Sequence, residues 1–112
     1  MAKSPNILNL EMTRGDTKAF AIEISGLEQD LETAYLSCKL NQDDENYVFQ
    51  KSIGNGITKI ETGKYRAKIA PADTKNLEIG TYYYDLEIGL DGDIYTIAKG
   101  KLQITYDVTR EA

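Results

Sequence analysis

The sequence contains no histidine and no tryptophan, and it has one cysteine and two prolines among its 112 residues. Without histidine, Ser–His and Cys–His nucleophile pairs are excluded, and zinc would have to be held by carboxylates and one thiol. Cys38 cannot form an intrachain disulfide, and its alternation with Leu36 and Leu40 predicts a buried, structural thiol. A chain without disulfides suits the reducing cytoplasm.

The sequence also lacks the segments that indicate phosphate binding, export or membrane insertion. Neither G-x-x-x-x-G-K-[ST] nor G-x-G-x-x-G occurs in it. No apolar run is long enough for a signal peptide or a membrane span. We therefore expect a protein that is made in the cytoplasm, is not secreted by a signal peptide, contacts no membrane and binds no cofactor.

Acidic residues outnumber basic ones by 18 to 13, which gives a net charge of -5 and a pI near 4.7. A surface of that sign repels phosphate backbones, so nucleic-acid binding would require a local basic patch. Lys64, Arg66 and Lys68 are the candidate patch, and they alternate along one predicted strand. Such a row on an acidic domain is typical of a solvated strand face, so we expect no nucleic-acid partner.

Two-residue alternation of apolar and polar side chains dominates the chain. It predicts short strands that are separated by turns rich in Gly, Asn and Asp, near residues 8–12, 20–24, 34–40, 48–51, 57–61, 65–69, 82–88, 94–98 and 102–106. This pattern predicts an all-β fold: a single immunoglobulin-like antiparallel β-sandwich of eight or nine strands over residues 1–112. We expect residues 1–6 to be a flexible tail, and at most one helical turn near Pro71–Asn76.

Three local signals refine this fold. Asp91-Gly92 is a strong hairpin turn. Gly100 separates two predicted strands and is interpreted as a β-bulge. Tyr82 follows the polar turn that begins at Pro71, where sandwiches of the immunoglobulin type place a tyrosine whose hydroxyl bonds back to the corner.

The alternation also predicts which side chains form the core. It turns Tyr82 and Tyr84 inward together with Leu86, and it leaves Tyr83 on the other face beside Asp85 and Glu87. The full predicted core is Leu10, Phe20, Ile22, Leu36, Cys38, Leu40, Phe49, Ile57, Tyr65, Ala67, Ile69, Leu77, Tyr82, Tyr84, Leu86, Ile88, Ile97, Leu102 and Ile104.

Two motifs suggest a binding function but have simpler explanations. Arg14-Gly15-Asp16 spells the integrin-binding tripeptide, yet Gly permits a positive φ and Asp favours a turn. The acidic runs 43–45 and 91–93 suggest calcium, but neither supplies the ligand spacing of an EF-hand. We interpret both as turn chemistry and expect no metal site.

Four stretches together resemble a known family: R-G-D-T at 14–17, P-A-D-T-K-N-L at 71–77, G-T-Y-Y-Y-D-L-E-I at 80–88 and G-K-L-Q-I-T-Y-D-V-T at 100–109. The chain is similar to the immunoglobulin-like N-terminal domain of siphophage baseplate upper proteins and related prophage tail or baseplate proteins. The resemblance implies that the motif residues determine the fold: Gly15, Asp16, Thr17, Pro71, Asp73, Thr74, Gly80, Tyr82, Tyr84, Asp85, Gly100, Asp107 and Thr109.

The resemblance implies a non-enzymatic structural protein of the virion tail or baseplate, which docks onto other tail or baseplate proteins and onto further copies of itself. It offers no catalytic residues. An alternative from another class is a carbohydrate-binding sandwich that uses exposed tyrosines. That alternative gains if three or more of Tyr35, Tyr47, Tyr83 and Tyr95 line one exposed face. A small glycosidase-like enzyme would instead need two carboxylates about 5–10 Å apart in a cleft.

Overall fold

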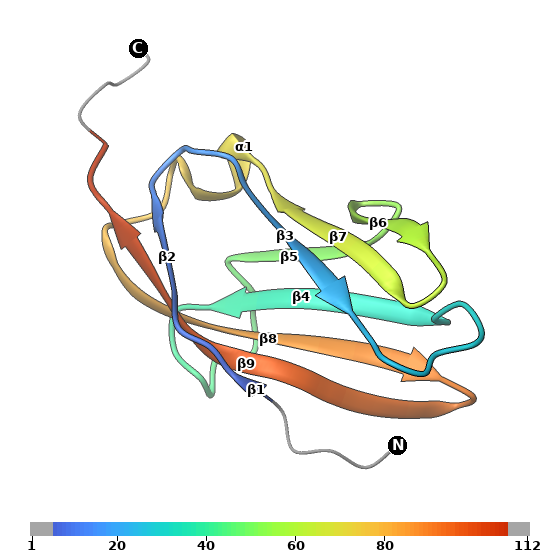
Figure 1. Cartoon of the computed structure of the whole chain (residues 1–112). Coiled ribbons are helices and arrows are strands. Elements are labelled where there is room, and N and C mark those ends of the chain that lie inside the picture. Colours follow the sequence, from blue (N-terminus) through green and yellow to red (C-terminus); the bar gives the residue numbers. More distant parts are fainter. Residues whose placement is uncertain (1–5, 108–112) are drawn as a thin grey trace.

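The computed structural model describes residues 6–107, which form nine strands and one short helix (Figure 1). Most of the predicted tail, residues 1–5, lies outside this range, and its last residue, Asn6, begins the first strand. The elements are β1 (Asn6–Ile7), β2 (Leu10–Thr13), β3 (Lys18–Glu23), β4 (Thr33–Lys39), β5 (Phe49–Ile53), β6 (Gly56–Glu61), β7 (Lys64–Ile69), α1 (Pro71–Thr74), β8 (Gly80–Leu90) and β9 (Asp93–Thr105).

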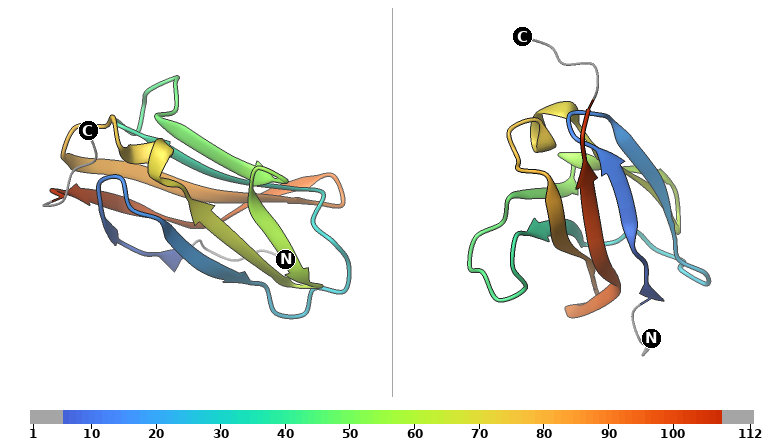
Figure 2. Two further views of the ribbon diagram at one scale, coloured as in Figure 1. Left: turned by 90° about the horizontal axis from the view of Figure 1, so that it is seen from above. Right: turned by 90° about the vertical axis from the view of Figure 1, so that its left-hand side faces the viewer.

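The strands form two layers that face each other, as the turned views in Figure 2 show. Hydrogen bonding runs in the order β1-β9-β8-β4-β5-β6-β7-β3, and β2 also pairs with β9. The ladder passes from one layer to the other between β5 and β6, where only two residue pairs connect the strands, Ser52 with Gly56 and Ile53 with Ile57. One layer therefore consists of β1 and β2 beside β9, followed by β8, β4 and β5, and the other consists of β6, β7 and β3.

The first predicted strand is divided in two. β1 and β2 both pair in parallel with β9, and they are interrupted at Leu8 and Asn9. Leu8 still donates its backbone N–H to the carbonyl of Lys99 at 2.9 Å. The N-terminal segment thus lies along β9 and ends the layer there.

The core lies between the layers and largely follows the predicted alternation. Tyr82, Tyr84, Leu86 and Ile88 are all buried along β8, as the alternation predicts. Leu10, Phe20, Leu77 and Ile97 from the predicted set are partly buried against the core. The prediction missed three buried hydrophobic residues: Met12, Leu31 and Ala34.

Leu40 was wrongly placed in the core, because it is 50% exposed. β4 ends at Lys39, so the alternation of side chains stops one residue earlier than the sequence pattern suggests. The chain then turns at Asn41, whose backbone N–H donates to Asp44 Oδ2 at 3.0 Å. This turn places Leu40 at the surface.

The β8–β9 hairpin confirms the predicted Asp91-Gly92 turn, since both residues have positive φ, 54° and 81° and Leu90 pairs with Asp93. Two-residue turns with positive φ at both positions match the twist of the strands that they join. The predicted bulge at Gly100 is wrong. β9 is continuous, and the register shifts instead beside Leu86, whose partner is Ala98, while Glu87 pairs with Thr96.

Gly100 has another role in the fold. It pairs regularly with Tyr84, and a Cβ built on it would overlap the carbonyl oxygen of Leu8. Glycine at this position therefore lets the backbone of the N-terminal segment come close to β9 at Leu8.

Candidate functional site

Two regions contain the residues that the sequence singled out, and the first is the end of the sandwich around α1. Here the turn between β2 and β3 meets the helix. Gly15, with φ of +80°, donates its backbone N–H to Thr74 Oγ1 at 2.8 Å. Thr74 is fully buried, so this bond joins two motifs that lie 59 residues apart.

Asp73 organises the start of α1. Its Oδ2 accepts a hydrogen bond from the backbone N–H of Ala70 at 2.7 Å, and Lys51 Nζ lies 2.7 Å from the same oxygen. Pro71 occupies the first helical position, where its missing N–H costs nothing. The predicted helical turn is thereby confirmed, and an ion pair connects it to β5.

Arg14 is held in the same region. Its Nε and Nη2 atoms donate to Asp107 Oδ1 at 3.2 and 3.1 Å, and Nη1 donates to the carbonyl of Leu77 at 3.4 Å. Only 14% of the Arg14 side chain is exposed. An integrin-type ligand needs a free arginine, whereas this arginine is held by contacts within the fold. The Arg14-Gly15-Asp16 turn therefore has a structural role, which agrees with its interpretation from the sequence. We call Arg14, Gly15, Asp73, Thr74 and Asp107 the corner cluster.

The tyrosine corner is also confirmed. Tyr82 Oη donates to the carbonyl of Glu78 at 2.8 Å, and burial raises the pKa of its hydroxyl. Gly80, with φ of +151°, begins β8 in a conformation that favours glycine.

The side chains of Asp16 and Thr17 are exposed, and these residues contribute to the fold through the backbone of their turn. The Asp16 N–H donates to the carbonyl of Thr13 at 3.1 Å. Thr109 lies outside the described residues.

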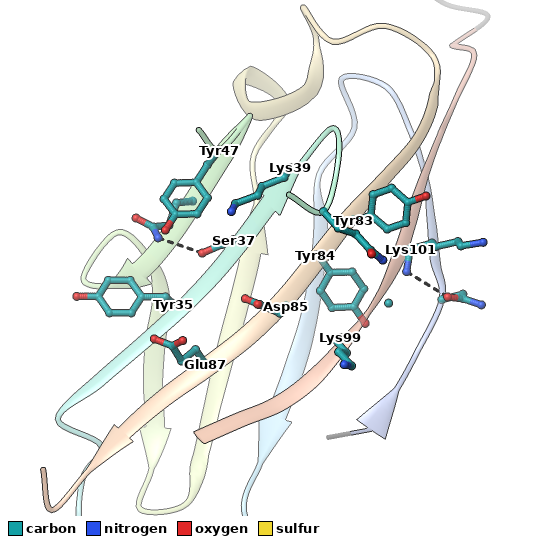
Figure 3. A pocket seen from close by; sticks show the side chains of 14 residues that line it. Tyr35, Ser37, Lys39, Tyr47, Tyr83, Tyr84, Asp85, Glu87, Lys99 and Lys101 are labelled. Carbon is teal, nitrogen blue, oxygen red and sulfur yellow. Dashed lines mark hydrogen bonds between the residues drawn. The ribbon is translucent and has the colours of Figure 1, made fainter. Parts of the chain in front are cut away.

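The second region is the outer face of β4, β5, β8 and β9, which is hollowed into an open depression of about 880 Å³. Tyr35, Tyr47 and Tyr83 line it. Figure 3 shows Tyr35 and Tyr47 on one side and Tyr83 on the other, with Ser37 and Asp85 between them. We call this the tyrosine face; its remaining members are Asn9, Ser37, Lys39, Gln42, Gln50, Tyr84, Asp85, Glu87, Lys99, Gly100 and Lys101.

Strand register brings these side chains together. Across β4, β8 and β9, one row consists of Ser37, Asp85 and Lys99, and the next consists of Lys39, Tyr83 and Lys101. Side chains directly opposite in such pairs lie close enough to interact. Tyr83, Asp85 and Glu87 therefore share the outward face that the alternation predicts for them.

Several contacts fix the tyrosine face. Lys39 Nζ donates to the carbonyl of Asp44 at 2.6 Å and lies 5.4 Å from the centroid of the Tyr47 ring. Gln50 Nε2 donates to Ser37 Oγ at 3.0 Å. Burial raises the pKa of the Asp85 carboxyl, an effect that Lys39 and Lys99 partly oppose.

Tyr95, the fourth tyrosine of the sequence criterion, packs against the core instead. Three of the four tyrosines thus line one face, which is the arrangement that favours the carbohydrate-binding alternative. The side chain of Tyr84 is buried in the core, and its hydroxyl reaches the rim and donates to the carbonyl of Leu8 at 2.7 Å.

The other candidate groups have structural roles. Burial raises the pKa of the Cys38 thiol to about 12, so at neutral pH it is a protonated core group. Asp91 Oδ1 accepts a bond from Gln29 Nε2 at 2.9 Å, and Asp44 closes its own loop. Within residues 6–107, no group of three or more acidic or cysteine side chains is arranged to hold a metal ion.

No helix in the described part of the chain is long and apolar enough to cross a membrane.

Comparison with known proteins supports the fold. No protein-family model and no curated protein sequence matches this chain. Among solved structures, the chain is similar to the extracellular domain of the voltage-gated sodium channel beta4 subunit, from a study of parallel homodimers that explain its role in cell–cell adhesion. The TM-score is 0.50 at 11% identity, over 96% of this chain and 98% of that one. The chain has an immunoglobulin-like β-sandwich fold.

Proposed function

We propose that this chain is a non-enzymatic structural protein of a phage or prophage tail or baseplate, which acts through protein–protein docking in the virion. The observation that carries the proposal is the corner cluster. The motifs of the resemblance are far apart in the sequence, yet Gly15 bonds Thr74 and Arg14 bonds Asp107. Because the corner cluster connects these motifs in the folded chain, it explains why the motifs of the resemblance occur together in this order.

The fold is suited to assembly. β3 lies at the end of the hydrogen-bonded order, so one of its edges has no strand partner within the described residues. A free edge can pair with a strand of a neighbouring protein. The partners that we propose are other tail or baseplate proteins and further copies of this chain.

The test is to induce lytic growth in the producing strain, band the particles on a density gradient and probe the band for this chain. A fixed copy number per particle is expected, and that number gives the ring symmetry. An abundant soluble protein of the host, probed in the same fractions, controls for contamination. If the chain remains in the soluble lysate while intact particles lack it, the tail function is wrong.

Carbohydrate binding is the second candidate function. It is favoured by one observation, the position of Tyr35, Tyr47 and Tyr83 around a single depression. Exposed aromatic rings beside hydrogen-bonding groups suit a ligand that has apolar faces and polar edges.

A further inference from the structure

We propose that the tyrosine face is a binding site for an uncharged oligosaccharide. This inference sharpens the second candidate function and does not depend on the tail role. Its geometric basis is the depression of about 880 Å³ across β4, β5, β8 and β9. Ligand sites commonly have volumes of about 300–1,000 Å³ and combine aromatic walls with a few polar groups.

The walls supply stacking surfaces. Tyr35 and Tyr47 stand on one side of the depression and Tyr83 on the other (Figure 3). Tyr47 is 50% exposed, and Tyr35 and Tyr83 are half-buried, so each ring keeps accessible surface while its base is fixed. A pyranose ring presents C–H groups on its faces, and these apolar groups pack against the face of an aromatic ring.

The floor supplies hydrogen-bond acceptors. Asp85 lies between Ser37 and Lys99 in the strand register, and burial raises the pKa of its carboxyl. No donor within residues 6–107 makes a hydrogen bond to that carboxylate. A partly desolvated acceptor without a hydrogen-bond donor gains from a ligand hydroxyl. Glu87, next along the same face, adds a second carboxylate.

The charges of the face select against a charged ligand. Its lysines are Lys39, Lys99 and Lys101, and its carboxylates are Asp85 and Glu87. The two carboxylates lie next to each other along β8, and Lys99 and Lys101 lie beside them along β9. Because both signs occur on the same face, neither a polyanion nor a polycation meets a field of one sign. Lys39 is also occupied by the carbonyl of Asp44. Hydroxyl groups, which both donate and accept, match this mixture.

The same surface is a poor match for a protein partner. Protein interfaces have apolar centres from which charged residues are depleted. Among the exposed large apolar residues of the described chain, only Tyr47 lines the depression; the others are Leu8, Leu40, Ile53, Ile60, Ile94 and Tyr106. The centre of the depression is charged and polar, which favours a hydroxylated ligand.

The experiment is an NMR titration of the ¹⁵N-labelled chain with maltotetraose, cellotetraose and tri-N-acetylchitotriose, each up to about 10 mM. Tetragalacturonate and a chitosan tetramer are the anionic and cationic comparisons. We expect saturable shifts with at least one neutral probe, centred on the amides of Tyr35, Ser37, Tyr83 and Asp85. Because each of these rings supplies one wall of the depression, Tyr47→Ala and Tyr83→Ala should each weaken binding at least fivefold.

Tyr106→Ala is the matched control, because Tyr106 is 76% exposed and lies outside the depression. Tyr47 lies in the loop before β5, so truncating its side chain leaves the core intact. Tyr47→Ala therefore tests the inference even if Tyr83→Ala does not fold. The inference is wrong if no neutral probe shifts these amides, or if the shifts survive Tyr47→Ala unchanged. If only the charged probes shift these amides, the proposal of a neutral ligand is wrong but the carbohydrate-binding function is retained. If no probe shifts them, both are wrong. Shifts of these amides with protein concentration alone would assign the face to a second copy and overturn the inference.

Discussion

At the scale of single residues, burial decides what each apolar side chain contributes. Leu86 is 4% exposed in the middle of β8, and Leu40 is 50% exposed just after β4. The two residues are chemically identical and both continue an alternating pattern. Their difference comes from where a strand ends, so the pair gives a direct test of the core.

Leu86→Ala should lower the free energy of unfolding by about 2–5 kcal/mol, through lost transfer free energy and the cavity left behind. Leu40→Ala should change it by less than about 0.5 kcal/mol, as is usual for surface positions. Urea unfolding of both variants is the measurement. Equal effects would mean that the core boundary is misplaced.

Asp85 gives a prediction for pH dependence. Burial raises its folded-state pKa above the ordinary value of 3.8, so ionisation is less favourable in the folded protein than in the unfolded chain. The resulting destabilisation is fully present above the folded-state pKa and disappears as pH falls below the unfolded value. Asp85→Asn should therefore stabilise the protein at pH 7, and this gain should vanish at low pH.

The measurement is urea unfolding of both proteins from pH 3 to pH 8, together with an NMR titration of the Asp85 carboxyl. Lys39 and Lys99 lower this pKa, so Lys39→Met should raise it further and enlarge the gain from Asp85→Asn. An Asp85→Asn variant that is less stable than the parent at pH 7 would show that the carboxylate has a stabilising partner.

At the scale of elements, the position of the N-terminal segment depends on Gly100 of β9, the strand to which this segment is hydrogen-bonded. Leu8 donates to Lys99 and accepts from Tyr84 Oη. A side chain at Gly100 would occupy the space of the Leu8 carbonyl. The close approach of the two backbones is therefore what fixes residue 100 as glycine.

Gly100→Ala should displace the Leu8 backbone and reduce stability by about 1–3 kcal/mol, as overpacking does. Hydrogen exchange at the Leu8 amide should accelerate, while amides in β3 and β7 keep their relative protection. Lys101→Ala, an exposed change on the same strand, is the control and should leave the Leu8 amide protected. Unchanged exchange at Leu8 in Gly100→Ala would contradict this explanation.

The strands themselves could be predicted from the sequence, because alternation and turn residues are local signals. The Asp91-Gly92 hairpin and the Tyr82 corner are examples. The role of Gly100 could not, since it depends on Leu8, which lies 92 positions earlier in the sequence. A bulge is the local explanation for a glycine in a strand, and a close approach requires knowledge of the partner.

The tyrosine face illustrates the same limit. Alternation places Tyr83, Asp85 and Glu87 on one face, but it does not say which residues of β4 lie beside them. The register that sets Ser37 opposite Asp85 is a tertiary property. The sequence therefore raised the question of where the tyrosines point, and only the paired strands answer it.

At the scale of the whole molecule, the corner cluster joins segments from both ends of the chain. Arg14 follows β2, Leu77 precedes β8, and Asp107 follows β9. The guanidinium thus connects the N-terminal turn, the corner after α1 and the end of the last strand. Asp107 is 18% exposed in this contact, so the pair is screened less than a surface ion pair.

Arg14→Ala should reduce the free energy of unfolding by about 2 kcal/mol, because hydrogen bonds to charged groups contribute about 1.5–3 kcal/mol. Arg14→Lys should recover only part of the loss, since an ammonium group lacks the planar fork that reaches Asp107 and the Leu77 carbonyl together. Urea unfolding at low and high salt is the measurement. A surface pair would lose its contribution at high salt, whereas this one should keep most of it. Full recovery by lysine would mean that charge alone, and not the fork, holds the two ends of the chain together.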